Sequence, residues 1–230
     1  MRSCRKTYAV LLCLSSSWAA SAPAQTGAEK RGGLSANVEL VSDYRFRGVS
    51  LSNRKPALQA GMEYEHQSGF LFGGWGSNIA ENEGADIELD LYAGYSGSAA
   101  GVAYSVTAFK YFYPGASRLN YVELQSKVAA PLGPAHGWLE LAFTPSQRNA
   151  DQNIYTAAGI SYDGPYDVTF HAKGGRENGA YRSKWDYEVG LTRSIKRVSL
   201  RAAVVTTNRR AARLGKEGSP GFFFGAGLDF

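Results

Sequence analysis

The chain has 230 residues, of which 44% are hydrophobic and 20% are charged, and its formal net charge is +5. This length and apolar content are enough for one sizeable folded unit, which excludes a disordered chain. The first 24 residues contain three basic and no acidic side chains, so the rest of the chain is close to neutral. A basic surface for nucleic acid is therefore not indicated, and we expect no nucleic-acid partner.

Residues 1–24 have the organisation of a secretory signal peptide. Arg2, Arg5 and Lys6 precede a short apolar run at 8–14, and Ala22-Pro23-Ala24 provides a small-residue cleavage site. A transmembrane anchor would need roughly 20 apolar residues, and this run is far shorter. We expect residues 1–24 to be removed on export and residues 25–33 to form a short lead.

Both cysteines of the chain, Cys4 and Cys13, lie within the expected signal peptide. The exported protein would then contain no cysteine. Disulfides and thiolate metal sites cannot stabilise it.

Beyond the lead, apolar and polar side chains alternate with the period of a β-strand. In "LSANVELVSDYRFRG" the residues Leu34, Val38 and Leu40 share one face, while Asn37 and Glu39 lie on the other. The same alternation recurs in "ADIELDLYAGY", "YVELQSKV" and "WDYEVGLTR". One face of each segment is therefore apolar and the other is charged.

About twelve such segments follow one another, each near the roughly 9 to 11 residues of a tilted membrane strand. They are 34–47, 56–66, 69–78, 86–96, 101–112, 120–129, 137–144, 154–163, 166–174, 183–194, 197–207 and 221–230. We predict that residues 34–230 form an all-β, transmembrane, antiparallel up-and-down β-barrel with about 12 strands, with 10 as the alternative.

The links between the segments alternate in length. Short links such as "QSG" and "DGP" follow every second segment, and the others are mostly longer and polar, as in "VSLSNRKP" and "NIAENEGA". Outer-membrane barrels have this asymmetry, together with aromatic girdles at both membrane interfaces. The predicted girdle at the long-loop end comprises Tyr44, Phe46, Tyr111, Phe112, Tyr113, Tyr155 and Trp185. The predicted girdle at the other end comprises Tyr64, Phe70, Tyr95, Tyr162, Tyr166 and Phe230.

The final segment, "FFFGAGLDF", resembles the carboxy-terminal assembly signal of bacterial outer-membrane barrels. Gly225, Leu228 and Phe230 match the glycine, the hydrophobic residue and the terminal aromatic residue of that signal. Phe223 departs from it, since a polar residue is usual there. The resemblance implies the barrel-assembly machinery as a partner.

The front of the chain resembles the TorF-type porin family. The similarity lies in "VELVSDYRFRGVSLSNRKPALQAGMEYEHQSGFLFGGWGSNI", then "IELDLYAGYSG" and "YFYPG", within residues 36–115. It implies a bacterial outer-membrane barrel that passes small hydrophilic solutes. It supplies no catalytic residues.

The alternation directs many charged side chains into the lumen. The predicted pore-lining residues are Glu39, Asp43, Arg45, Arg47, Glu63, Asp86, Glu88, Asp90, Lys127, Lys173, Asp186, Glu188 and Arg201. Glu65, Glu123 and Glu140 have the same inward parity. Buried without water or partners, such groups would cost several kcal/mol each. They either line a narrow aqueous pore that sorts solutes by size and charge, or they pair with one another and stiffen the wall.

Other functions have weaker support in the sequence. A closed structural or adhesive barrel acting through its outer loops remains the alternative to a channel, and a soluble β-sandwich remains the alternative fold. No nucleophile motif such as G-x-S-x-G accompanies the three histidines, so we expect no enzyme and no cofactor. The carboxylates of "DIELD" lie along one strand face rather than around a loop, which argues against a calcium site. The basic residues Arg209, Arg210, Arg213 and Lys216 of the last loop could contact lipopolysaccharide in the outer-membrane lipid.

Overall fold

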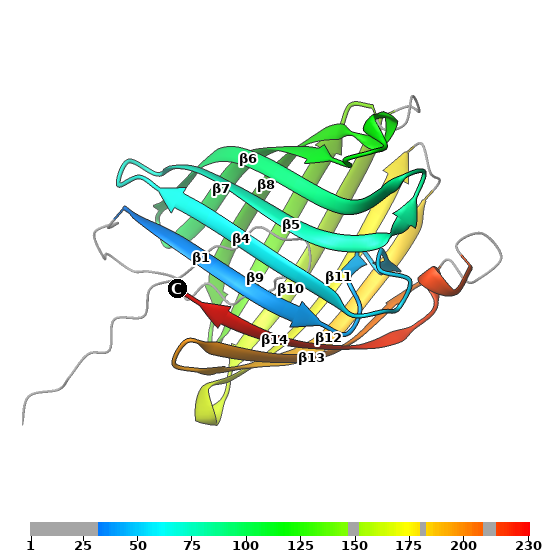
Figure 1. Ribbon diagram of the computed structural model, residues 1–230. Coiled ribbons are helices and arrows are strands. Elements are labelled where there is room, and N and C mark those ends of the chain that lie inside the picture. The colour runs from blue at the N-terminus through cyan, green and yellow to red at the C-terminus, as the bar shows by residue number, and fades with distance from the viewer. Residues whose placement is uncertain (1–31, 147–151, 180–182, 209–214) are drawn as a thin grey trace, which may run out of the picture.

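The computed structural model describes residues 32–146, 152–179, 183–208 and 215–230. The predicted signal peptide and the basic residues Arg209, Arg210 and Arg213 lie outside these ranges. Twelve strands form one closed antiparallel barrel (Figure 1), which confirms the predicted fold class and the predicted strand count. They are β1 (Gly33–Val41), β4 (Ala57–Glu65), β5 (Phe70–Asn82), β6 (Ala85–Ala99), β7 (Val102–Phe112), β8 (Tyr121–Leu132), β9 (Ala135–Thr144), β10 (Asn153–Asp163), β11 (Val168–Gly179), β12 (Lys184–Ile195), β13 (Val198–Thr207) and β14 (Gly221–Asp229).

The barrel closes where its first strand meets its last. On one side β1 pairs with β4, and on the other it pairs with β14 in the register Val38 to Leu228. The backbone N–H of Phe230 donates a hydrogen bond to the carbonyl oxygen of Ala36 at 2.9 Å. Closure leaves no free strand edge in the barrel, because every strand has two neighbours.

The two ends of the barrel differ in their connections. We call the end where β1 begins and β14 finishes the terminal end, and the other the loop end. At the terminal end, two-residue turns at 100–101, 133–134 and 196–197 join consecutive strands. At the loop end, the connections at 42–56 and 208–220 are much longer. The predicted asymmetry is thus present in part, because two links at the loop end, 83–84 and 180–183, are short.

The shorter of these two links joins β5 and β6. The sequence predicts a long loop in "NIAENEGA", but both strands continue and meet at Glu83 and Gly84. These two residues have φ angles of 59° and 99°, as a tight hairpin turn of the right twist requires. The register shifts between Asn78 and Asn82, so a bulge interrupts the strict alternation there.

The outer face of the barrel is apolar and the inner face is polar. Along β1, Val38 and Leu40 are 41% and 57% exposed, whereas Glu39 between them is 1% exposed. Along β4, Leu58 and Met62 likewise point outward. Large apolar side chains cover the outside of nearly every strand, an amount of exposed apolar surface that requires a covering environment.

The described parts of the connections contain three short 3-10 helices: η1 (Ser117–Leu119), η2 (Pro165–Asp167) and η3 (Gly215–Gly218). No helix among the described residues is long and apolar enough to cross a membrane.

The first strand is shorter than the sequence predicts. It ends at Val41 rather than at 47, and residues 42–56, which we call the inward segment, fold into the loop end of the lumen (Figure 1). Within this segment, β2 (Arg45–Phe46) and β3 (Val49–Ser50) form a small hairpin. Its turn uses positive φ angles at Arg47 and Gly48, of 47° and 85°. Alternation continues through such a hairpin, so the pattern alone did not reveal where the strand ends.

The predicted aromatic girdle is wrong in part at the loop end. Tyr44, Tyr111 and Tyr155 are each 3% exposed and lie inside the barrel. Their hydroxyl groups donate to carboxylates there. The rings of Tyr111 and Tyr155 contact Phe46 and Arg47 of the inward segment. At the terminal end, the outward and exposed aromatic residues agree with the prediction. They include Phe70, Tyr95, Tyr162, Tyr166 and Phe230.

Candidate functional site: the lumen and the inward segment

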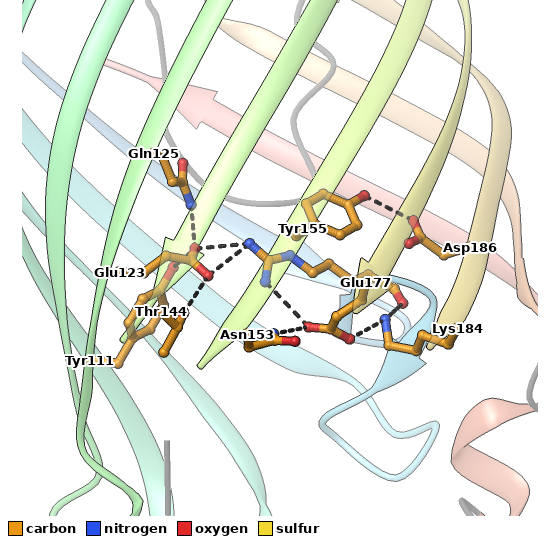
Figure 2. A network of polar contacts seen from close by, with 10 residues as sticks. Tyr111, Glu123, Gln125, Thr144, Asn153, Tyr155, Glu177, Lys184 and Asp186 are labelled. Carbon is orange, nitrogen blue, oxygen red and sulfur yellow. Dashed lines mark hydrogen bonds and ion pairs between the residues drawn. The ribbon is translucent and has the colours of Figure 1, made fainter. Parts of the chain in front are cut away.

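Arg47 attaches the inward segment to the opposite wall of the barrel. Its Nη2 donates to both carboxylate oxygens of Glu123 at 2.8 and 2.9 Å, and its Nη1 donates to Glu177 at 3.4 Å. Glu123 lies on β8 and Glu177 on β11, and Figure 2 shows the two carboxylates approaching a common centre. Arg47 is 4% exposed. A guanidinium suits this arrangement, because its two terminal nitrogens can donate to two different carboxylates at once.

Each carboxylate that binds Arg47 has further donors of its own. Glu123 accepts hydrogen bonds from Tyr111, Gln125 and Thr144 at 3.3, 2.8 and 3.0 Å (Figure 2). This set of donors holds the carboxylate in the position in which it contacts Arg47.

On β11, Glu177 accepts a hydrogen bond from Asn153 at 2.8 Å and forms an ion pair with Lys184 at 2.9 Å. The Nζ atom of Lys184 also donates to the backbone oxygen of Arg47 at 2.7 Å. The wall therefore holds Arg47 through both its side chain and its main chain.

Aromatic rings flank the same guanidinium. Its carbon lies 4.1 Å from the ring centroid of Tyr155 and 4.6 Å from that of Phe46. The Tyr155 hydroxyl donates to Asp186 at 3.1 Å. Cation–π contacts of this kind gain strength away from water.

The rest of the inward segment is bound nearer its own strands. Asp43 accepts from Arg45 at 2.6 Å and from Ser50 at 2.6 Å. Arg45 also donates to the backbone oxygen of Ser219 at 2.9 Å, and Tyr44 donates to Glu88 on β6 at 3.1 Å. The segment consequently spans the lumen from β6 to β12 and narrows it at the loop end.

Further into the barrel, Arg201 on β13 pairs with Glu39 on β1 across the intervening strand β14. Arg201 lies 3.1 Å from Glu39 and 4.8 Å from the ring of Phe223. The inward Phe223, which departs from the assembly pattern, thus supports a lumen cation. A Cβ atom at Gly225 would collide with the Glu39 carboxylate, so the glycine makes room for this pair.

A second paired group lies on β11 and β12. Glu188 accepts from His171 at 3.1 Å and pairs with Lys173 at 3.3 Å. On β8, Lys127 lies opposite Glu140 and 4.6 Å from the ring of Trp138. These basic residues all have a carboxylate neighbour.

The wall formed by β4, β5 and β6 differs in that three of its inward carboxylates have no basic partner among the described residues. Glu63, Glu88 and Asp90 face inward and are at most 8% exposed. None of the three forms an ion pair within the described part of the chain. Aromatic side chains surround this region instead, among them the cluster of Tyr92, Phe109, Tyr111 and Tyr121.

The predicted pore-lining residues are thus distributed over three places. Asp43, Arg45 and Arg47 lie inside the barrel but on the inward segment rather than on a strand of the barrel. Asp86 is exposed at the start of β6 and contacts none of the groups above. The others lie on the inner face of the strands: Glu39, Glu63, Glu88, Asp90, Lys127, Lys173, Asp186, Glu188 and Arg201.

Two residues that bind Arg47, namely Glu177 and Lys184, are not among the predicted pore-lining residues. Glu177 lies beyond the predicted end of its strand at 174, since β11 continues to Gly179. Lys184 is the first residue of β12 and precedes the clear alternation. Glu177 lies four positions after Lys173, and Lys184 lies two positions before Asp186, so an extended alternation would have placed both side chains on the inner face.

One contact resembles part of a catalytic arrangement. His66 Nδ1 and Ser68 Oγ are 2.7 Å apart, a pairing not predicted from sequence, but both residues are exposed in the turn after β4. Ser68 also donates its backbone N–H to the same ring, which is a local turn contact. Among the described residues, no three His, Cys, Asp or Glu side chains are grouped to hold a metal ion.

The fold is similar to that of small porins of known structure. A structure described as the KdgM porin aligns with a TM-score of 0.62 and 10% identity over 85% of this chain and 98% of that one. The KdgM porin in complex with disordered oligogalacturonate gives a TM-score of 0.58, 10% identity and coverages of 86% and 97%. A NanC porin structure gives 0.59, 9% identity and coverages of 86% and 99%. At these identities the similarity concerns the fold alone.

Sequence comparison gives a family but no activity. No curated protein matches the chain significantly. A family profile described as "Bacterial protein of unknown function (Gcw_chp)" matches residues 25–218, which is most of the chain. The chain therefore belongs to the Gcw_chp family of bacterial proteins.

Proposed function

We propose that this protein is an outer-membrane channel for the passive diffusion of small hydrophilic solutes. The observation that carries the proposal is a closed barrel with an apolar exterior and a charged interior, a combination that suits lipid outside and water inside. The similarity of the fold to the KdgM and NanC porins supports the same conclusion. It also agrees with the resemblance of the front of the chain to TorF-type porins.

The proposed location is the bacterial outer membrane, reached by export through a cleaved signal peptide at residues 1–24. Gly225, Leu228 and Phe230 would serve as the assembly signal for the barrel-assembly machinery. Leu228 and Phe230 are 41% and 61% exposed on the outer face, where a receptor could contact them before closure. Lipid and lipopolysaccharide would then surround the apolar exterior.

The proposed aqueous path runs along the charged inner face, past Glu39, Lys127, Lys173 and Arg201. The inward segment is its constriction, since Arg47 connects this segment to β8 and β11. Charged groups that face one another across a narrow path select solutes by size and charge. Small solutes are consequently the proposed cargo, and the KdgM complex with oligogalacturonate is a precedent for solute binding in this fold.

The same constriction favours one competing function. The Arg47 contacts are buried and numerous, as expected of a closed barrel that serves as a structural or adhesive element through its outer loops. An enzyme has less support, because the KdgM and NanC structures that share this fold are porins and the Ser68–His66 pair lies in an exposed turn.

Electrical conductance decides between the channel and the closed barrel. The protein without residues 1–24 would be refolded in detergent and inserted into a planar lipid bilayer. Discrete conductance steps are the expected result. Absence of steps from protein that shows heat-dependent gel mobility, and is therefore a folded barrel, would reject the channel and favour the structural alternative.

A further inference from the structure

The charges in the lumen are unevenly paired. The basic side chains of Arg45, Arg47, Lys173, Lys184 and Arg201 each form an ion pair with an inward carboxylate. The wall of β4 to β6 contributes the inward carboxylates of Glu63, Glu88 and Asp90, for which no described residue supplies a cation. Asp186 on β12 also forms no ion pair with a described residue, but three of the inward carboxylates without one lie together on β4 and β6.

Each of these three carboxylates has one buried oxygen atom without a hydrogen-bond partner among the described residues, and two of the carboxylates, Glu88 and Asp90, lie on the same strand, β6. Glu88 and Asp90 are 1% and 8% exposed, and Glu88 Oε2 and Asp90 Oδ1 receive no donor from the described residues. The other oxygen of Glu88 accepts from the Tyr44 hydroxyl. A buried carboxylate requires a partner, which points to a positively charged group that is not part of the wall.

Aromatic rings border the same pair of carboxylates. On the inner face, Asp90 lies directly opposite Trp75 on β5 and Tyr111 on β7, at the cross-strand spacing of neighbouring side chains. Tyr92 is on the same face of β6, two residues along. The ring of Tyr44 lies 5.4 Å from that of Trp75 and places the inward segment over the group.

This combination favours an organic cation over a metal ion. A metal ion would need several oxygen or nitrogen ligands around one point, and the described residues offer no such group of three. An ammonium or quaternary ammonium group instead uses the faces of aromatic rings together with carboxylate charge.

We propose that Glu88 and Asp90, with the rings of Trp75, Tyr92 and Tyr111, form a binding site for a small organic cation in the lumen. The inference rests on the proposed channel for the route by which the solute arrives. It gives that channel a substrate class, namely small solutes that carry an ammonium group.

The test is binding of tetramethylammonium chloride to the folded protein in detergent, measured by isothermal titration calorimetry against a potassium chloride background of constant ionic strength. Saturable binding is expected. The double variant Glu88→Gln, Asp90→Asn should bind at least tenfold more weakly, whereas Asp86→Asn, which removes an exposed charge from the same strand, should bind normally.

A second variant separates the rings from the charges. Trp75→Leu keeps both carboxylates and should also weaken tetramethylammonium binding several-fold. The inference is overturned if the wild-type protein shows no saturable binding, if the double variant binds as well as wild type, or if potassium displaces the probe at equal concentration.

The outcome is independent of the test of channel function. Conductance without tetramethylammonium binding would leave the channel in place and remove the cation site. Binding without conductance would keep the site and remove the channel.

Discussion

At the scale of single residues, Arg47 connects the inward segment to three strands of the barrel, β8, β10 and β11. It connects the inward segment to Glu123 and Glu177 and stacks on Tyr155. Removing one member of such a buried group leaves the other charges without compensation, which typically costs about 3 to 5 kcal/mol.

We therefore expect Arg47→Ala to lower the thermal unfolding temperature in detergent and to raise the single-channel conductance. The barrel ladder does not include Arg47, so the protein should still fold. Circular dichroism on heating and bilayer recordings measure the two effects. Lys55→Ala, which removes an exposed charge from the same segment, is the matched control. An unchanged conductance with a lowered unfolding temperature would mean that Arg47 stabilises the segment without restricting the path.

At the scale of elements, the inward segment is an insertion within an otherwise regular hairpin of β1 and β4. Those two strands pair from Gly33 opposite Glu65 to Val41 opposite Ala57, without help from β2 or β3. The ladder should survive replacement of the segment, because its hydrogen bonds lie outside it.

Replacing residues 44–51 by a Gly/Ser linker of equal length should therefore leave the barrel folded and widen the path. The expected result is retained heat-dependent gel mobility together with a larger conductance step than that of Arg47→Ala. A linker that leaves conductance at the wild-type value would place the constriction elsewhere in the lumen. Loss of the folded gel form would show instead that the segment is needed for barrel formation.

At the scale of the whole molecule, the distribution of apolar and charged side chains is the reverse of that in a soluble protein. The apolar side chains of the barrel point outward and its charges inward, along each strand in turn. This arrangement can be tested by thiol labelling, because the cysteine-free chain after residue 24 gives no background.

Lys127→Cys is expected to react with a charged, water-soluble thiol reagent in lipid vesicles, whereas Val128→Cys is not. The two positions are adjacent on β8 but face opposite sides of the sheet. Mass spectrometry after labelling gives the extent of reaction. Equal labelling of the two positions would contradict the orientation of the barrel wall.

The sequence by itself determined the succession of strands, because the period of two is local and repeats in every segment. It predicted a closed barrel, and the pairing of β1 with β14 decided it. It also identified the inward parity of Glu88, Asp90 and Lys173. The inward segment, the partners of Arg47 and the interior location of Tyr44 and Tyr155 were decided only by the tertiary structure. Hairpin β2–β3 alternates much as a barrel strand does, so the pattern could not show that the chain turns inward after Val41. Glu123 and Glu177 meet Arg47 across 76 and 130 positions of the sequence, and only closure of the barrel brings such distant residues together.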